Sequence, residues 1–376
     1  MRTKKEVAQI LDLSWDKVEF IGLNSWQIRT LRAIRDCRTV ALGGHVDACD
    51  SCGHIQISYN SCRNRHCPKC QGHKRDQWIA ARSSELLPVP YFHVVFTLPQ
   101  ELNTFALHKP KLIYDALFKA AWATIAAFAG KRNKSGMIAI LHTWGQNLSL
   151  HPHLHCIVPG GMVTSTGKWQ LTKSKGKFLF PVKAMSRVFR AKYMSILRQT
   201  ERISPVLSKA LFSKEWVVYA KQPFGSPKSV VEYLGRYTHK VAISNHRILA
   251  IDDQRVTISY KDYRVAGQKK TMTLSHGEFI RRFALHILPK RLVRIRHFGI
   301  LSSKWKPNKL PKLQSFLTNL PLDKTSEKQK KSKPAFVPKC PCCKSGTMII
   351  VMTFGTRGPP DYLKTGWVTS NTNAIV

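Results

Sequence analysis

From about residue 91 onward, apolar residues form short dense blocks that polar and turn residues separate. The block FHVVFTL (92–98) is almost continuously apolar and stops at Pro99, a pattern typical of a buried strand. Other blocks rich in β-branched and aromatic residues predict strands at 137–146, 153–161, 216–222, 241–251 and 255–263. The last two segments would pair as a hairpin around Asp252-Asp253-Gln254.

Helical patterns lie between and around these strands. The strongest is KLIYDALFKAAWATIAAFAG (111–130), which ends at Gly130. Ser226 followed by Pro227 is typical of a helix start and opens the helix KSVVEYLGRYTHK (228–240). Further helices are expected in the first ~45 residues, in the basic stretch 182–213 with a break near Pro205, and in the cationic segment 278–296 with an interruption at Pro289. This order of elements predicts an α+β fold with a central, largely antiparallel sheet and helices packed on one face.

The charge balance narrows the class of partner. The 376 residues include 61 Lys and Arg but only 21 Asp and Glu, a formal net charge of +40. Such a surface attracts polyanions, and each phosphate contact releases condensed counterions. Nucleic acid is favoured over a membrane, because we find no secretory h-region and the most apolar stretch, Ala120 to Ala129, is too short to span a bilayer. A cytosolic location follows, and there ten clustered cysteines indicate metal ligands rather than disulfides.

Two C-x2-C knuckles, Cys49/Cys52 and Cys67/Cys70, lie in a loop-rich segment with few apolar residues. Four thiolates at this spacing predict one tetrahedral zinc site that staples the segment. Cys62 and His66 are alternative ligands, although the spacing favours the outer four. Cationic residues around the second knuckle suit phosphate contacts: Arg63, Arg65, Lys69, Lys74 and Arg75. A solvated basic face is the competing interpretation of these five.

The tail carries one further pair, Cys340 and Cys343, with Cys342 between them. One pair supplies only half of a tetrahedral site. It could share a metal with a distant residue such as Cys37 or have no ligand role, so no metal is assigned there.

The segment HTWGQNLSLHPHLHCIVPGG (142–161) holds four histidines among apolar positions. Because side chains alternate along a strand, His153 and His155 project from one face. A turn at Asn147-Leu148 would place His142 opposite His153 on that same face. Neutral imidazoles bind divalent ions well. An isolated H-x-H is often only two polar strand residues, but this density predicts a metal site, with His142 as third ligand and His151 and Gln146 as alternatives.

Tyr233 and Tyr237 stand four residues apart on the helix predicted at 228–240, hence on one helical face. Two tyrosines at this spacing usually pack on a core. Near a metal site in a cationic protein, they are also candidate nucleophiles toward a DNA phosphorus, giving a 5′-phosphotyrosine and a free 3′-hydroxyl. Lys240, three residues past Tyr237, could stabilise the developing charge.

Together these motifs resemble the HUH endonucleases, named for a His–hydrophobic–His motif that here is His153-Leu154-His155. The chain closely resembles the two-tyrosine transposases of bacterial rolling-circle insertion sequences, the insertion sequence 91 family. The resemblance covers nearly the whole chain and rests on the segments CRNRHCPKCQG, FHVVFTLP, LHTWGQNLSLHPHLHCIVPGG, YLGRYTHKVAISNHRI and EFIRRFALHILPKRLVRIRHFG.

The resemblance implies Mg or Mn at the histidine pair, zinc in the amino-terminal region, and Tyr233 and Tyr237 as alternating nucleophiles. Its substrates would be single-stranded element ends and target DNA in the bacterial cytoplasm, at the nucleoid, with the host replication machinery copying the displaced strand. The expected organisation is a helical segment (1–45), a zinc-ribbon-like, DNA-contacting module (46–85), an HUH catalytic domain (86–265), a basic DNA-binding region (266–321) and a linker with a cysteine-bearing tail (322–376). The basic region offers four candidate DNA contacts: Arg281, Arg282, Arg294 and Arg296.

Three other functions compete with this one. A rolling-circle replication initiator would use the same chemistry in another biological role. A non-catalytic zinc-ribbon regulator would bind DNA without nicking it, with the tyrosines in its core. A metal-dependent hydrolase that uses water needs carboxylates, and the histidine strand has no acidic residue near it. The target sequence, the oligomeric state and the order of the tyrosines do not follow from the sequence.

Overall fold

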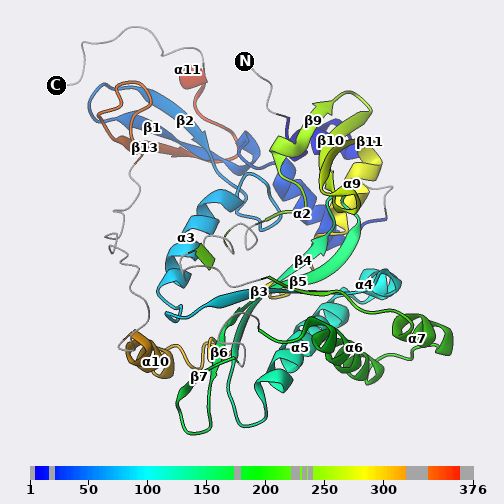
Figure 1. Ribbon diagram of the computed structural model, residues 1–376. Coiled ribbons are helices and arrows are strands. Elements are labelled where there is room, and N and C mark those ends of the chain that lie inside the picture. Colours follow the sequence, from blue (N-terminus) through cyan, green and yellow to red (C-terminus); the bar gives the residue numbers. More distant parts are fainter. Residues whose placement is uncertain are drawn as a thin grey trace.

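The computed structural model describes residues 5–16, 22–172, 179–221, 229–230, 235, 240–318 and 338–364, without the side chains of 72–77, 264, 362 and 364. Its centre is a five-stranded antiparallel sheet in the order β12-β4-β5-β3-β8 (Figure 1). The strands are β3 (Tyr91–Thr97), β4 (Gly136–Trp144), β5 (Leu150–Pro159), β8 (Val218–Lys221) and β12 (Ile295–Gly299). The predicted α+β class with an antiparallel sheet is confirmed.

Helices cover one face of this sheet (Figure 1). They are α4 (Asn103–His108), α5 (Pro110–Ala129), α6 (Val182–Arg198) and α7 (Pro205–Phe212). The alternation of β5 sends Leu154, Cys156 and Val158 into the core beneath α5 and α6. Burying each such side chain stabilises the fold by roughly 1.5–3 kcal/mol. The same alternation leaves His153 and His155 on the opposite face.

Among the described residues, α5 is the one helix long and apolar enough to cross a membrane. Its 20 residues extend well beyond Ala120–Ala129, the apolar stretch that the sequence alone identified as too short to span a bilayer. More than half of its most apolar window is buried, and Leu117, Phe118 and Ala121 pack in the core with the sheet. Helix α5 is therefore a core helix of this fold.

A second core joins segments far apart in the chain. It packs α1 (Val7–Leu13) and α2 (Ser25–Arg35) against α9 (His276–Ala284) and a small antiparallel sheet. That sheet has the order β11-β10-β9, with β9 (Ile248–Ile251), β10 (Arg255–Asp262) and β11 (Gln268–Ser275). Trp26 Nε1 donates to the Leu288 carbonyl at 3.0 Å across this contact. The amino-terminal helices thus support the β9–β11 sheet.

The amino-terminal cysteine region contains strands that its polar composition concealed. β1 (Gly44–Cys49) lies between β2 (Ile55–Tyr59) and β13 (Met348–Phe354) in a third antiparallel sheet, visible beside α3 (Gln71–Ser83) in Figure 1. The remaining elements are β6 (Gly161–Val163), β7 (Trp169–Leu171), α10 (Lys309–Thr318) and α11 (Asp361–Lys364). The carboxyl-terminal tail therefore completes a sheet that begins near residue 44.

One predicted helix ends early. The segment 278–296 was expected to be helical, but α9 stops at Ala284 and Ile295–Gly299 form strand β12. Pro289 cannot continue a helical hydrogen-bond ladder, and the chain beyond it pairs with the edge of β4. The segment 266–321 consequently contributes strand β12 to the central sheet.

Candidate metal centre and nucleic-acid interface

Three histidines converge on the open face of the central sheet. His142 on β4 lies directly opposite His153 on β5, which confirms the pairing predicted from the turn. His155 follows two residues later on the same face. One ring nitrogen from each of the three lies within 4.8 Å of the others. His151 is exposed and lies outside this set, although its ring centroid is 5.1 Å from that of His153.

The electrostatics at His153 and His155 favour neutral imidazoles. Burial, together with the charges of His151 and Lys240, lowers the pKa of His153 to about 4. Burial and the neighbouring His153 hold the pKa of His155 well below its usual value. Neutral imidazole is the form that binds a metal ion. His153 and His155 are therefore in the form that binds a metal ion near neutral pH.

Hydrogen bonds fix the orientation of two of the rings. His153 Nδ1 lies 2.7 Å from the His151 carbonyl and donates to it, which leaves Nε2 as the ligand atom. His155 Nδ1 lies 2.9 Å from His93 Nε2. His93 on β3 is buried, and sequence reasoning missed it. Its signal was present, because histidine is the one strongly polar side chain within FHVVFTL.

Tyr233 and Tyr237 lie outside the described residues. Two described residues of the same part of the chain, Gly235 and Lys240, line one pocket. The charge of Lys240 contributes to the lowered pKa values of both His153 and His155, after the larger effect of burial. The Lys240 carbonyl accepts a hydrogen bond from Arg294 Nη2 at 2.7 Å, which ties this position to the chain before β12.

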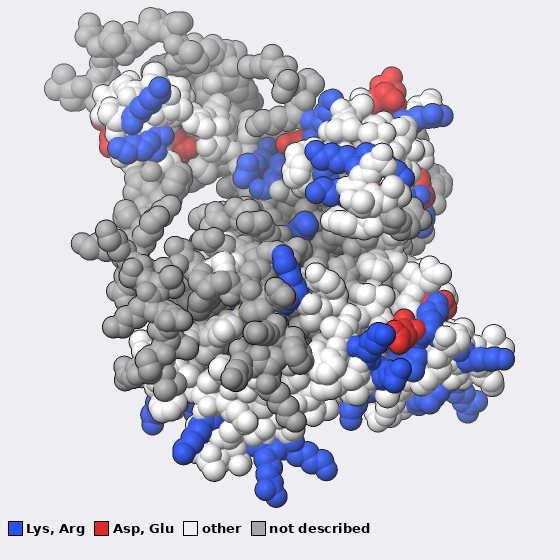
Figure 2. Space-filling model, viewed as in Figure 1, with Lys and Arg blue, Asp and Glu red and all other residues white. Residues whose placement is uncertain are grey.

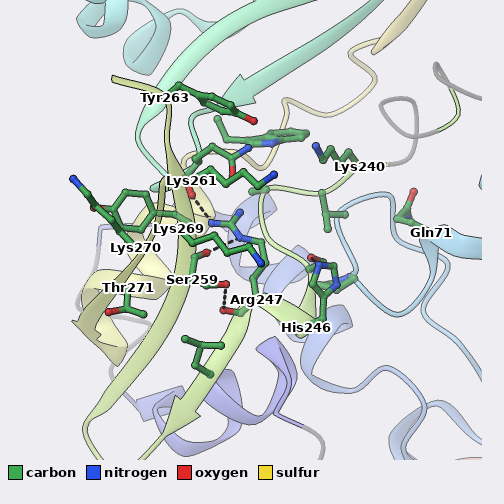
Figure 3. Close-up of a pocket in the computed structure, with 18 of the residues that line it drawn as sticks. Gln71, Lys240, His246, Arg247, Ser259, Lys261, Tyr263, Lys269, Lys270 and Thr271 are labelled. Carbon is green, nitrogen blue, oxygen red and sulfur yellow. Dashed lines mark hydrogen bonds between the residues drawn. The ribbon is translucent and has the colours of Figure 1, made fainter. Parts of the chain in front are cut away.

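The pocket next to the histidines has a volume of about 860 Å³ and a cationic lining. Its cations come from the 240–247 segment and the β10–β11 hairpin: Lys240, Arg247, Lys261, Lys269 and Lys270. In Figure 3, Lys240 and Lys261 approach the cavity from opposite sides. The lining residues that the structure describes include no Asp or Glu. Figure 2 shows Lys and Arg side chains gathered over the β9–β11 sheet that forms one wall.

Aromatic groups accompany these cations. Tyr263 lines the pocket and is 71% exposed, so its ring is accessible to a planar ligand. Trp144 lines the same pocket and stacks on His142. Cations interleaved with aromatic rings are suited to a single nucleic-acid strand, whose phosphates and bases they contact separately. Sequence reasoning missed all of the pocket cations except Lys240, because they become neighbours only when the hairpin folds.

Several predicted DNA contacts have partners within the protein. Arg294 is buried, donates to the Leu141 and Lys240 carbonyls, and has its pKa lowered to about 9 by burial. Its predicted role as a DNA contact is therefore corrected to a structural one. Arg65 donates to the carbonyls of Leu292 and Pro289.

Most of the other predicted DNA-binding cations form ion pairs within the protein. Their ionic partners are Glu6 for Lys69, Glu278 for both Arg281 and Arg282, and Asp115 for Arg296. Arg63 is exposed on the surface. The side chains of Lys74 and Arg75 lie outside the described residues. Clustering of cations in the sequence thus identified a mixture of structural and surface groups.

The cysteines form two four-thiol clusters rather than one. Cys67 and Cys70 converge with Cys37 and Cys62, and the described structure gives His66 no place in that set. Cys49 and Cys52 converge with the tail residues Cys340 and Cys343. The predicted single site of Cys49, Cys52, Cys67 and Cys70 is corrected accordingly, as is the suggested pairing of the tail with Cys37. The C-x2-C spacing identified the cysteine pairs, but it could not show which pairs share a metal site.

The zinc-binding part of the chain matches a known family model. Residues 10–98 match the model described as "Transposase zinc-binding domain", and residues 136–309 match one described as "Putative transposase". The first span contains the Cys37–Cys62–Cys67–Cys70 cluster, and the second contains the three convergent histidines.

A curated relative from Sinorhizobium fredii, named "Putative transposase y4qJ", is 40% identical across 96% of this chain and 98% of its own length. The chain belongs to the insertion sequence 91 family of transposases.

A second relative of this transposase is the "Transposase for insertion sequence element IS801" from Pseudomonas savastanoi pv. phaseolicola. It is 29% identical across 79% of this chain and 75% of the relative. No solved structure matches the chain. The zinc-binding description fits the thiol clusters, because four sulfurs within 4.8 Å of one another are the donor set that zinc prefers.

Proposed function

We propose that this transposase nicks single-stranded DNA at the histidine centre and transfers the strand through 5′-phosphotyrosine intermediates, in rolling-circle transposition. The observation that carries the proposal is the convergence of His142, His153 and His155 on the open sheet face, beside a cationic pocket. The histidine motif on an antiparallel sheet with helices behind it also supports an HUH-type fold. Host replication machinery would copy the strand that the reaction displaces.

The three histidines would hold the proposed divalent cation, Mg or Mn. They supply three nitrogen donors on one side, which leaves open positions on the cation for oxygen ligands. A cation bound there would polarise the scissile phosphate as a Lewis acid. His93 would orient His155, and the His151 carbonyl would orient His153, so that the ligand nitrogens stay aimed at one point.

Tyr233 and Tyr237 would supply the nucleophiles. The phenolic oxygen of one tyrosine attacks phosphorus, the bond to the 3′ oxygen breaks, and that oxygen leaves as a 3′-hydroxyl after taking a proton. Attack of a 3′-hydroxyl on the phosphotyrosine reverses these changes and joins two strands without ATP. Lys240 lies close enough to perturb His153 and His155, so its ammonium would stabilise charge on the reacting phosphate.

The cationic pocket would hold the DNA strand that leads to this centre. Lys261 and Lys269 line it and would contact successive phosphates, while the exposed ring of Tyr263 would stack on a base. Because these contacts are to backbone and ring faces, they would bind strands of many sequences. Recognition of the element end would need additional contacts to base edges.

The family membership favours a transposase over a replication initiator with the same chemistry. It does not separate a catalytic from a non-catalytic DNA-binding role. The decisive experiment incubates the protein with single-stranded DNA carrying the element end and Mn, then measures an adduct that resists denaturant. Wild type should form the adduct, each of Tyr233→Phe and Tyr237→Phe should retain part of it, and the double variant should form none.

A matched control is available on β2. Tyr59 is 37% exposed and lies in the β13-β1-β2 sheet rather than the central sheet, so Tyr59→Phe should leave the adduct unchanged. The pair His153→Ala and His155→Ala should abolish the adduct and keep most DNA affinity, which resides in the cationic surface. DNA binding by wild type without any adduct would instead support the non-catalytic regulator.

A further inference from the structure

The cluster that joins the two ends of the chain has the geometry of a metal site. Cys49 Sγ lies 3.7 Å from Cys343 Sγ, and Cys52 Sγ lies 3.7 Å from Cys340 Sγ. A zinc ion with Zn–S bonds of about 2.3 Å in a tetrahedron places its sulfurs about 3.8 Å apart. A disulfide would bring two sulfurs to about 2.05 Å. The four thiols therefore stand at the spacing of metal ligands.

The backbone around both knuckles is arranged for thiolates. The N–H groups of Ser51 and Cys52 donate to Cys49 Sγ at 3.4 and 3.5 Å. In the tail, the N–H of Cys342 donates to Cys340 Sγ at 3.4 Å, and that of Gly346 donates to Cys343 Sγ at 3.3 Å. Both pairs thus carry N–H donors directed at sulfur, which stabilises the negatively charged form that binds a metal.

Pairing of the surrounding strands fixes the two knuckles face to face. Cys49 is in register with Met348, at the ends of β1 and β13. The Asp50 N–H donates to the Thr347 carbonyl at 3.1 Å, and the Thr347 N–H donates to Asp50 Oδ1 at 2.7 Å. A side chain at Gly346 would place its Cβ 2.4 Å from Cys49 Sγ, so the chains approach as closely as glycine allows.

We propose that Cys49, Cys52, Cys340 and Cys343 bind a second zinc ion, which fastens the carboxyl-terminal tail to the amino-terminal region. The site is distinct from the Cys37–Cys62–Cys67–Cys70 cluster, because the structure assigns the two sets no common residue. It also extends beyond the zinc-binding span 10–98. The tail is thereby an integral part of the amino-terminal fold, and this assignment does not depend on the phosphotyrosine chemistry.

Metal content of the purified full chain tests the proposal. Wild type should contain two zinc ions, and the double variant Cys340→Ser/Cys343→Ser should contain one. Cys342 is exposed and outside the cluster, so Cys342→Ser should keep both ions. A wild-type content of one zinc, or two ions in the double variant, would overturn the assignment.

A second variant keeps every thiol. Gly346→Ala should displace the Cys49 sulfur and weaken binding of one zinc ion, measured by release to a competing chelator. Gly355→Ala is its control, because a Cβ at Gly355 meets no atom within 4 Å. Hydrogen exchange gives an independent measurement: amides of β13 should lose protection in Cys340→Ser/Cys343→Ser, while those of β3 to β5 keep theirs. Unchanged β13 protection together with unchanged zinc release in Gly346→Ala would refute the site.

Discussion

The imidazole of His142 stacks on the indole of Trp144, with ring centroids 4.5 Å apart and planes inclined by 19°. Trp144 also lines the cationic pocket, whereas His142 belongs to the convergent histidines. One aromatic pair therefore forms the boundary between the candidate metal centre and the candidate DNA pocket. A strand held in the pocket would therefore lie within one side chain of the candidate metal ligands.

The third metal ligand can be distinguished by comparing two histidines. His142→Ala should lower Mn affinity by more than the roughly 10–100-fold that losing an outer-shell partner costs, because it removes a ligand. His151→Ala should change it little, since its ring lies outside the convergent set. Isothermal titration with Mn on both variants measures the difference. Equal losses in the two would place His151 among the ligands.

His93 is expected to act as a positioning residue. His93→Phe removes the hydrogen-bond partner 2.9 Å from His155 Nδ1 and should weaken Mn binding roughly 10–100-fold. His93→Gln, whose amide oxygen can accept the same hydrogen bond, should recover part of that affinity. A purely packing role predicts the opposite order, with Phe tolerated better than Gln at this buried position.

The pocket cations should determine the salt dependence of DNA binding. Lys261→Ala removes one phosphate contact and should reduce the slope of log affinity against log salt by about 0.7, the value for a single strand. Lys192→Ala is the matched control, because Lys192 is exposed on α6, on the helix-covered side of the sheet. Fluorescence anisotropy at several salt concentrations measures both slopes. An identical slope for Lys261→Ala and wild type would remove the pocket from the DNA path.

Arg294 should affect stability rather than DNA affinity. Arg294→Met leaves the buried Leu141 carbonyl without its guanidinium donor and should lower the free energy of unfolding by about 1–3 kcal/mol. The salt slope of DNA binding should stay at the wild-type value. Urea unfolding and anisotropy measure the two quantities, and a changed slope with unchanged stability would restore the DNA-contact role.

The first thiol cluster should hold its own zinc ion. Cys37 Sγ lies 3.6 Å from Cys70 Sγ, so Cys37→Ser should lower the zinc content by one ion and destabilise the region around α3. Cys156→Ser keeps the content unchanged, since Cys156 is buried beneath the helices of the central sheet. Zinc analysis of both variants tests the grouping. Full zinc content in Cys37→Ser would instead favour the single site of Cys49, Cys52, Cys67 and Cys70 that the sequence predicted.

The sequence predicted those parts of the site that depend on local periodicity. The two-residue repeat of a strand and one short turn were sufficient to pair His142 with His153. The partners of Cys49 could not be found this way, because C-x2-C spacing is the same whichever distant pair completes the tetrahedron. The role of Arg294 was equally hidden, since its acceptors are backbone carbonyls that have no signature in a sequence. Local rules therefore found the ligands, and tertiary contacts decided their grouping.

Because β13 pairs with β1, the sheet that contains both strands cannot be completed until the carboxyl-terminal tail has been synthesised. Cys52 and Cys340 are 288 residues apart, and a ribosome adding about 5–20 residues per second needs roughly 15–60 s to span that interval. Throughout it, the β1–β2 hairpin presents an unpaired strand edge that other chains could join. The β13-β1-β2 sheet can therefore be completed only after β13 has been synthesised. A product truncated before β13 would leave the edge of β1 unpaired.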